Sequence, residues 1–287
     1  MTQATPTRAT RVSKKSDLNP SRIGLYILLC SLAIFYLIPV YVALNTSLKS
    51  FEEVSKTSAF TPVNAPNLSA YLDAFKALQQ GLLNSLAMAI PATIISSLLG
   101  SLNGYVLSKW KFRGADTIFP AVLFGMFIPY QSILIPLFQF MSDIRLAGST
   151  WALVLVHVVY GIPITSLIFR NFYATIPTSL VEAAKLDGAS FFGIYRYVLF
   201  PLSTNAFVVV LIWQFTNIWN DFLFAVTLSS PATQPVTVVL QGLGAGLISH
   251  YEIQMAGAIV AALPTLLIYI VLGRYFAQGV LAGSVKG

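Results

Sequence analysis

The side chains best suited to chemistry are uncharged amides and aromatic rings placed inside long apolar stretches. Amides donate and accept hydrogen bonds and aromatic faces offer apolar contact, so together they suit a small neutral polar solute. The candidates for lining a solute path are Gln131, Gln139, Gln214, Asn217, Trp219, Asn220 and Asp221, with Tyr130 beside the first. Hydrogen bonding between helices is the simpler explanation for any one of them alone. The prediction therefore depends on the set, above all on the polar stripe along residues 214–221.

Motifs that carry catalysis or bind cofactors are missing from the sequence. It contains no G-x-x-x-x-G-K-[ST] phosphate loop, no H-E-x-x-H and no G-x-S-x-G, so we expect neither ATP binding nor hydrolysis by this chain alone. The single cysteine, Cys30, excludes an internal disulfide and a cysteine-based metal site. His157 and His250 are far apart, and His157 either faces a polar path or bonds a neighbouring helix. No catalytic residue, metal site or cofactor is predicted here.

Charged side chains are nearly absent from the apolar stretches, where only Asp221 comes close to the interior. Carriers driven by protons usually embed Asp, Glu or His in the membrane, because these groups relay the protons. The sequence therefore argues against a proton-driven carrier and against a charged ion filter. If solute moves against a gradient, the energy must come from another chain.

Six apolar segments must position these residues. Hydrophobic residues make up 56% of the 287 residues and charged residues only 9%, whereas a soluble domain has about 25% charged residues. A spanning helix needs about 20 mostly apolar residues and satisfies its own backbone hydrogen bonds. The predicted spans are Ile23–Thr46, Leu83–Leu107, Thr117–Met141, Ala147–Phe169, Phe200–Val226 and Gln254–Gly273. The fold class is an all-α membrane protein with six transmembrane helices.

The distribution of Lys and Arg predicts the orientation in the membrane. Thirteen of the 17 Lys and Arg residues fall on one side if the amino terminus is cytoplasmic, so both termini are expected inside. The first apolar run has 24 residues, too long for a signal-peptide core of about 7–15 residues, and is interpreted as a retained helix. The predicted organisation is a cytoplasmic tail over residues 1–22, a membrane domain over 23–277 and a second cytoplasmic tail over 278–287.

Residues 177–201, between the fourth and fifth spans, predict a helix–turn–helix elbow in the cytoplasm. Ser179 and Glu182 make an S-x-x-E capping box that would start a helix. Gly188 stands where this helix must stop, the usual place for a positive φ. A second short helix is expected from about Ser190 to Pro201. Such an elbow is either a docking site for a partner or an amphipathic segment lying on lipid, and its local pattern suits both.

The same segment carries a longer signature. Glu182-Ala183-Ala184 is followed after three residues by Gly188, and after nine more by Val198-x-Phe200-Pro201. This spacing resembles the EAA signature of binding-protein-dependent ABC importer permeases, with Val198 in place of Ile and Phe200 in place of Leu. Further resemblance to the carbohydrate branch, and to its maltose-type second permease subunits, lies in Lys109–Arg113, Ile128-Pro129, Pro136, Trp219–Phe222, Ala262–Pro264 and the ending Gly279–Gly287, where Val280 replaces Leu.

The resemblance implies a type I ABC importer permease fold and a set of partners. The elbow would insert into a groove on an ATPase, through Glu182, Ala183, Ala184, Asp187, Gly188, Phe191 and Phe192. The tail residues Gly283, Lys286 and Gly287 would reach toward the ATPase dimer interface. The expected assembly is a heterodimer with a second permease in the inner membrane, two copies of an ATPase that bind ATP and Mg, and an extracytoplasmic sugar-binding protein. A sugar would be the substrate, and no nucleic acid is expected to bind.

Three other functions are weaker interpretations of the sequence. A stand-alone carrier would be expected to show embedded charge or inverted repeats. A membrane enzyme would need a nucleophile with a base, or a metal cluster. A permease of the same kind for another small polar solute fits the same residues. If the solute is a sugar, both a monosaccharide and a short oligosaccharide remain open. The main contacts with the sugar belong either to this subunit or to its companion.

Overall fold

The computed structural model describes residues 20–110, 112–245 and 250–284, and these residues are folded almost entirely into helices. Four helices are long and apolar enough to cross a membrane, namely α1 (Pro20–Ser47), α3 (Ser69–Lys109), α6 (Thr150–Thr175) and α13 (Tyr251–Ser284). Two further crossings are made by pairs of helices that are bent at short breaks. The predicted six spans are present when each bent pair is counted as one span.

The third crossing is broken in the middle of its predicted apolar span, Thr117–Met141. It consists of α4 (Ala115–Phe124) and η1 (Gly125–Phe127), followed after the break by η2 (Tyr130–Ile133) and α5 (Leu134–Asp143). The segments on the two sides meet at 86°. Pro129 causes the break, because it has no N–H and its ring forces Ile128 into an extended conformation, with φ −73° and ψ 118°.

The fifth crossing differs from its prediction at both ends. The short helices α8 (Phe191–Ile194), η3 (Tyr195–Leu199) and α9 (Phe200–Leu202) meet α10 (Thr204–Trp219) at 79°. The bend follows a π-helical turn, η3, and Pro201, which removes one backbone donor. The predicted span Phe200–Val226 is too long, because α10 stops at Trp219 and a separate helix, α11 (Leu223–Leu228), follows.

Shorter helices connect the crossings. They are α2 (Phe51–Lys56) after α1, α7 (Thr178–Leu186) in the elbow, and α12 (Val236–Leu243) before α13. Helix α13 runs on to Ser284, beyond its apolar span Tyr251–Gly273, so residues 278–284 of the predicted tail are helical. The rest of that predicted tail, 285–287, and most of the predicted amino-terminal tail lie outside the described residues.

Helices α3 and α6 form the most extensive helix pair, because small residues on α3 let the two backbones approach closely. A Cβ added at Gly100 would lie 2.1 Å from Thr165 Oγ1, and one at Gly104 would lie 2.6 Å from Phe169 Cβ. Thr165 Oγ1 also donates a hydrogen bond across the pair to the carbonyl of Ser96 at 3.1 Å. Small residues four apart are typical of membrane helix interfaces and let α3 and α6 pack closely.

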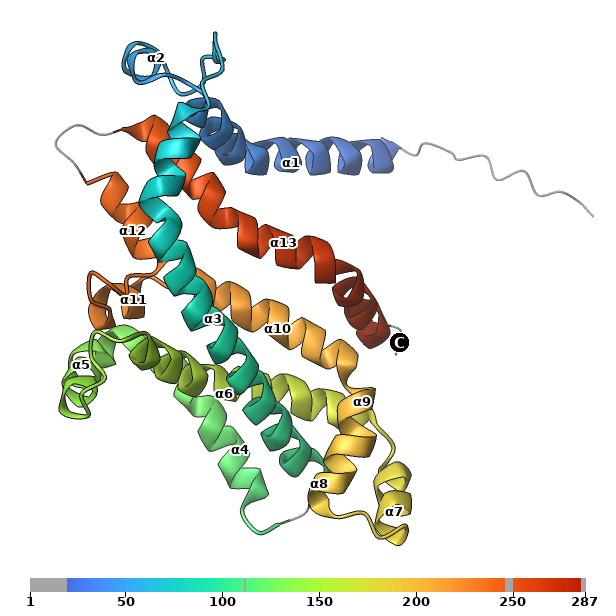
Figure 1. The fold of residues 1–287 in the computed structure, drawn as a ribbon. Helices are drawn as coiled ribbons and strands as arrows, with labels where there is room; N and C mark the ends of the chain where they lie inside the picture. Colours follow the sequence, from blue (N-terminus) through green and yellow to red (C-terminus); the bar gives the residue numbers. More distant parts are fainter. Residues whose placement is uncertain (1–19, 111, 246–249, 285–287) are drawn as a thin grey trace, which may run out of the picture.

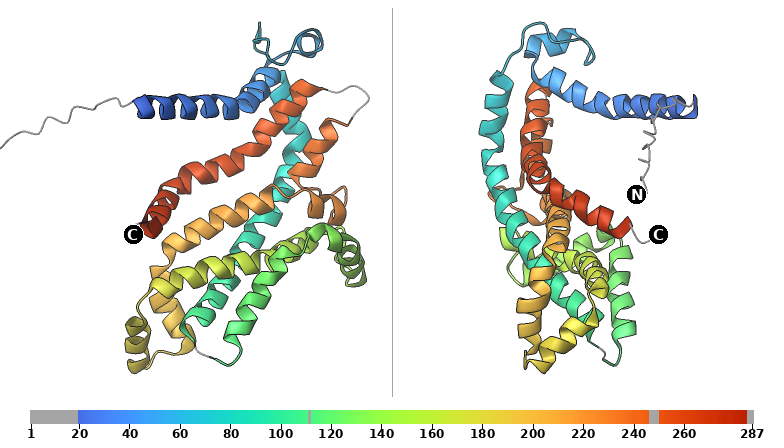
Figure 2. Two further views of the ribbon diagram at one scale, coloured as in Figure 1. Left: turned by 180° about the vertical axis from the view of Figure 1, so that it is seen from behind. Right: turned by 90° about the vertical axis from the view of Figure 1, so that its right-hand side faces the viewer.

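The connecting elements lie at opposite ends of the bundle. Helix α2 lies beside the start of α3 and the elbow helices α7 and α8 lie beyond its end (Figure 1). Helix α1 leaves the bundle and projects sideways in both further views (Figure 2), and its apolar side chains from Ile23 to Tyr41 are exposed. Apolar surface of this extent fits lipid, where the backbone of a single helix is already satisfied.

Candidate functional site

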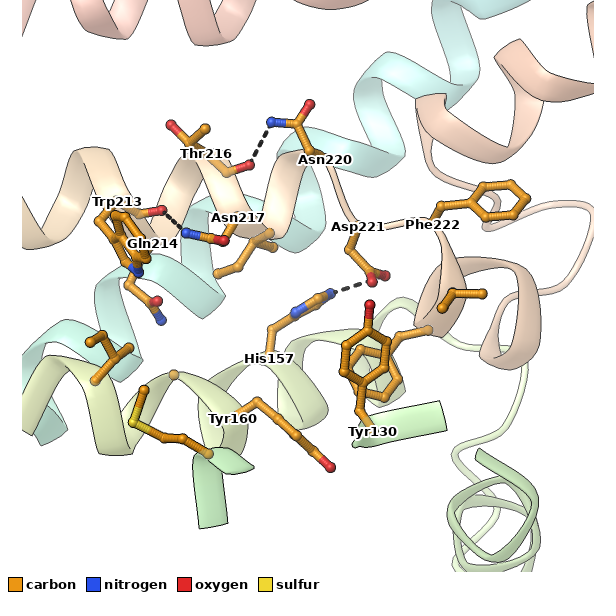
Figure 3. Close-up of a pocket in the computed structure, with 16 residues that line it drawn as sticks. Tyr130, His157, Tyr160, Trp213, Gln214, Thr216, Asn217, Asn220, Asp221 and Phe222 are labelled. Atoms are coloured by element: carbon orange, nitrogen blue, oxygen red, sulfur yellow. Dashed lines mark hydrogen bonds and ion pairs between the residues drawn. The ribbon is translucent and has the colours of Figure 1, made fainter. Parts of the chain in front are cut away.

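A cavity of about 550 Å³ opens between α6, α10 and the break in the third crossing. Its wall is shared by four parts of the chain: Met126 and Tyr130 at the break, residues 157–164 of α6, residues 213–218 of α10, and residues 220–224 before and within α11. Figure 3 shows the labelled side chains of these elements around the open space. Its volume lies in the range of pockets for small molecules, about 300–1,000 Å³.

The amide groups in this wall come from the end of α10 and from Asn220, the residue that follows it. Asn217 Nδ2 donates to the carbonyl of Trp213, and Asn220 Nδ2 donates to the carbonyl of Thr216, both at 2.8 Å (Figure 3). Each amide is therefore oriented by its own helix, and no described residue donates to its oxygen. An amide held in this way can accept a hydrogen bond from a solute hydroxyl and keeps a second N–H to donate.

His157 and Asp221 form a polar pair across the cavity wall. His157 Nε2 lies 3.6 Å from Asp221 Oδ2, and their side chains are 8% and 11% exposed. The same Oδ2 accepts a hydrogen bond from the backbone N–H of Ala225 at 3.0 Å, and Thr237 Oγ1 donates to the Asp221 carbonyl at 2.7 Å. Asp221 thus joins the turn before α11 to α12 and lies close to α6. No Lys or Arg is among the described residues that line the cavity.

Aromatic rings make the opposite side of the wall. Tyr130 and Tyr160 each pack on Phe224 with ring centroids 5.2 Å apart, and His157 meets Phe224 edge-on at 5.7 Å. Trp213 lines the cavity from α10 and is largely exposed. Aromatic faces beside neutral amides form a surface that suits a solute with both apolar C–H faces and hydroxyl groups.

Four of the seven predicted path residues line this cavity: Gln214, Asn217, Asn220 and Asp221. Gln214 is nevertheless buried, because it lies over Gly161 and donates to Ser96 Oγ at 2.9 Å, so it mainly joins α10 to α3. Sequence reasoning missed Trp213 and Tyr160. Spacing could have indicated both residues. Trp213 lies four residues before Asn217, on the same face of the helix, and Tyr160 lies three residues after His157.

The other three predicted residues lie elsewhere. Trp219 is 1% exposed and stacks on Phe215, and its Nε1 donates to the carbonyl of Ala261 at 3.0 Å, so it packs α10 against α13. Gln131 in η2 and Gln139 in α5 are exposed and do not line the cavity. Their expected helix is broken at Pro129, which turns α5 away from the direction that a straight span would follow.

The elbow begins differently from its prediction. Helix α7 starts at Thr178 after an N-cap at Pro177, with no side-chain cap, so the expected capping box of Ser179 and Glu182 is not formed. The helix starts two residues too early for it, because the N-cap is Pro177 and Ser179 already lies inside the first turn. Glu182 is exposed and makes no hydrogen bond to any described side chain, which leaves its carboxylate free for a partner.

The turn of the elbow confirms the prediction for Gly188. Gly188 has φ +81°, its N–H bonds the carbonyl of Lys185, and the N–H of Ala189 bonds the carbonyl of Ala184. This pair of bonds is a Schellman motif, which ends a helix with a left-handed residue. The next helix then starts at Phe191, with Ser190 Oγ accepting from the N–H of Gly193 at 3.2 Å.

The two phenylalanines of the elbow have different surroundings. Phe191 stacks on Tyr105 at 4.8 Å and packs on Trp110 at 5.3 Å, while Lys185 Nζ lies 4.2 Å from the centre of the Trp110 ring. Phe191 therefore anchors the elbow to the end of α3. Phe192 is 67% exposed.

Most of the other residues predicted for coupling also lie on the outer side of the elbow. Glu182, Ala183, Asp187 and Gly188 are exposed and Ala184 is half-buried. Leu186, which the prediction did not include, is 90% exposed. Of the predicted tail residues, Gly283 lies in the last turn of α13, whereas Lys286 and Gly287 lie outside the described residues.

A helical membrane protein with two broken crossings around a neutral polar cavity, and an elbow at one end, has the architecture of a transport subunit. Residues 92–281 match the family described as the binding-protein-dependent transport system inner membrane component, and the chain belongs to this family. It is thus a multi-pass inner membrane permease subunit, not an enzyme.

Relatives and solved structures agree with this assignment. A probable ABC transporter permease of Pyrococcus horikoshii is 46% identical over 94% of this chain and 99% of its own length. The xylose/arabinose import permease of Haloferax volcanii is 37% identical over 92% and 93% of the two chains, and the glucose import system permease of Saccharolobus solfataricus is 31% identical over 91% and 95%. A bacterial ABC transporter that imports alginate shares the fold, with a TM-score of 0.79, 22% identity, and coverage of 89% and 96%.

Proposed function

We propose that this chain is one permease subunit of an ATP-driven importer that carries a neutral sugar into the cell. It works as a heterodimer with a second permease, receives the sugar from an extracytoplasmic binding protein, and is driven by two copies of an ATPase that bind ATP and Mg. Both termini and the elbow face the cytoplasm. The two permeases line the path of the sugar together. The side chains of the companion decide which subunit makes more contacts with the sugar.

The observation that carries this proposal is the lining of the cavity. Its polar groups are mostly neutral amides, tyrosines and a tryptophan, which match the hydroxyl groups and C–H faces of a sugar. The single carboxylate, Asp221, accepts a hydrogen bond from the backbone N–H of Ala225 and lies 3.6 Å from His157 Nε2. An acidic sugar would lack a cationic partner in this wall. The names of the xylose/arabinose and glucose permeases support a neutral monosaccharide.

The elbow supports the ATPase partner. Its outer side presents exposed apolar side chains, Leu186 and Phe192, beside the carboxylate of Glu182. Exposed apolar surface on a short helical projection is suited to a groove on another protein. The sequence has no phosphate loop, so the energy of ATP would enter the membrane domain through this contact.

The direct test is uptake by the complete system in cells that lack other sugar importers. Labelled xylose, arabinose and glucose are supplied with and without this chain. We expect uptake of at least one sugar to require this chain, the companion permease, the ATPase and the binding protein together. ATP-dependent uptake of none of the three sugars, with all four components present in the membrane fraction, would contradict the proposal.

A second candidate is the import of a small osmoprotectant. An osmoprotective compounds uptake permease of Synechocystis is 31% identical over 92% of each chain. The carboxylate of Asp221 in an otherwise neutral and aromatic wall also suits a quaternary ammonium group. Glycine betaine separates the two candidates in the same assay. A sugar importer should not take up labelled glycine betaine, and an excess of the unlabelled compound should not reduce its uptake of sugar.

A further inference from the structure

Four hydroxyl groups join the elbow to the membrane helices in one line. Tyr195 OH of η3 donates to Ser101 Oγ of α3 at 2.9 Å, and Ser101 Oγ lies 2.6 Å from Tyr173 OH of α6. Tyr173 OH donates in turn to Ser203 Oγ at 3.2 Å. Ser101, Tyr173 and Ser203 are fully buried. We refer to these four residues as the hydroxyl chain.

Counting protons fixes the direction of the hydroxyl chain. Each hydroxyl has one proton to donate. Because Tyr173 gives its proton to Ser203, the proton of the bond between Ser101 and Tyr173 must come from Ser101. Ser203 gives its own proton to the carbonyl of Phe200 at 2.9 Å. Hydrogen bonds aligned in one direction polarise one another, and removal of one member leaves a buried partner unsatisfied.

The hydroxyl chain ends at the bend of the fifth crossing. Ser203 lies between α9 and α10, where the helix direction changes by 79°. The carbonyl of Phe200 accepts hydrogen bonds from both the N–H and the Oγ of Ser203, at 3.1 and 2.9 Å. Beyond this bend, α10 carries Asn217 and Asn220 into the cavity wall. The line of hydroxyl groups thus runs from the elbow to the start of the helix that lines the cavity.

Aromatic stacking fixes the elbow end of this line. Tyr105 of α3 stacks on Tyr195 with ring centroids 5.9 Å apart and also on Phe191 at 4.8 Å. Lys109 Nζ, one turn further along α3, donates to the carbonyl of Ile176 at the end of α6. Displacement of the elbow must therefore carry Tyr195 and the ends of α3 and α6 with it, or break buried hydrogen bonds.

We propose that the hydroxyl chain transmits movement of the elbow to the bend between α9 and α10, with Ser101, Tyr173 and Ser203 as positioning residues. This inference rests on the proposed function, because it requires a partner ATPase that moves the elbow. The four members of the hydroxyl chain are uncharged, and three of them are fully buried. Their loss should uncouple ATP hydrolysis from transport and leave docking of the ATPase intact.

The test compares Tyr173→Phe and Ser101→Ala with the parent in the complete complex, reconstituted in lipid vesicles with the binding protein. The quantity measured is labelled sugar imported per ATP hydrolysed, with xylose, arabinose or glucose as the probe. Each substitution removes two hydrogen bonds of the hydroxyl chain, so we expect this ratio to fall about fivefold or more, the equivalent of about 1 kcal/mol or more, while ATP hydrolysis continues. Tyr71→Phe is the matched control, because it removes a bond of the same type, from Tyr71 OH to Ser47 Oγ at 2.8 Å, at the other end of α3.

A double variant tests whether the residues act as one unit. Tyr195→Phe added to Ser101→Ala should lower the ratio no further, because the first link is already lost. If Tyr173→Phe and Ser101→Ala import as much sugar per ATP as the parent, the proposal is overturned. An equal loss in Tyr71→Phe, or failure of the variants to assemble, would also overturn it, since either would show a structural role only. Uptake by the parent tests the proposed function separately, and the ratio of variant to parent can be measured with any solute that the parent imports.

Discussion

At the scale of single residues, Asn217 and Asn220 are the amides best placed to meet a solute. Each is oriented by a carbonyl of its own helix and faces the cavity. Their neighbour Trp219 has similar chemistry but a different role, because it is buried against α13. One turn of helix thus contains both a candidate contact for the solute and a packing residue.

Replacement of these amides should weaken transport without affecting assembly. Asn217→Ala and Asn220→Ala each remove one neutral hydrogen-bonding group, worth about 0.5–1.5 kcal/mol, so we expect the KM for uptake to rise about two- to tenfold. The measurement is initial uptake against substrate concentration at equal amounts of subunit in the membrane. Gln139→Ala is the control, because this exposed amide of α5 does not line the cavity. Unchanged KM values in both asparagine variants would leave them with a packing role.

Lys49 is a second residue whose burial predicts its effect. Its side chain is 1% exposed, and its Nζ donates to Thr57 Oγ1 at 3.0 Å and to the carbonyl of Ser58 at 2.8 Å, which fixes the chain after α2. Lys49→Met should lower the free energy of unfolding by about 1–3 kcal/mol, because both acceptors lose their donor. Thermal unfolding of the purified complex measures this loss. Lys56→Met, at an exposed pair with Glu52, should change the midpoint little, and equal midpoints for both variants would contradict the role of Lys49.

At the scale of elements, the elbow depends on one glycine and one free carboxylate. Gly188 needs its positive φ to turn α7 into α8, and nothing lies within 4 Å of the position of a Cβ there. The penalty of any substitution therefore comes from the backbone conformation alone. Glu182 does not cap α7, so its charge is available to a partner.

Substitutions in the elbow should separate these two roles. Gly188→Val should reduce uptake strongly, because a β-branched residue in the left-handed region costs about 1 kcal/mol or more and redirects α8. Gly188→Asn, which tolerates this region better, should retain more uptake. Both variants are measured for uptake and for co-purification with the ATPase at equal subunit levels. Equal uptake by Gly188→Val and the parent would exclude the bend as a coupling element.

Glu182→Gln is the matching test of the carboxylate. Because no capping box exists, the amide preserves shape and removes only the charge. We expect weaker association with the ATPase and an uptake that depends less on salt, since an ion pair with a cationic partner would be screened. If the variant binds the ATPase as tightly as the parent does at every salt concentration, Glu182 has no role in docking.

At the scale of the whole molecule, the arrangement predicts how the chain lies in the membrane. Helix α2 and the elbow lie at opposite ends of α3 (Figure 1), and the distribution of Lys and Arg predicts that the elbow lies in the cytoplasm. A phosphatase reporter inserted within residues 57–67 should be active, and a fluorescent reporter after Gly287 should fluoresce. An active phosphatase at the carboxyl terminus would reverse or break this topology.

The sequence by itself determined the features that depend on composition and on local backbone chemistry. Six apolar segments required six helical crossings, because lipid offers no partner for a backbone N–H. The glycine at position 188 indicated a left-handed helix end, and the spacing around Glu182 indicated the family. These signals are local, so they could be interpreted before any contact between segments was known.

Only the tertiary structure decided how these segments bend and which faces meet. The sequence contained Pro129 and Pro201, but prolines 39, 91, 163 and 264 lie inside uninterrupted helices. The prolines alone do not show where a helix breaks, because the groups that satisfy the freed backbone come from other segments. Contacts between segments far apart in the chain also decided where three predicted path residues lie, namely Trp219, Gln131 and Gln139. The same kind of contact aligned the four residues of the hydroxyl chain.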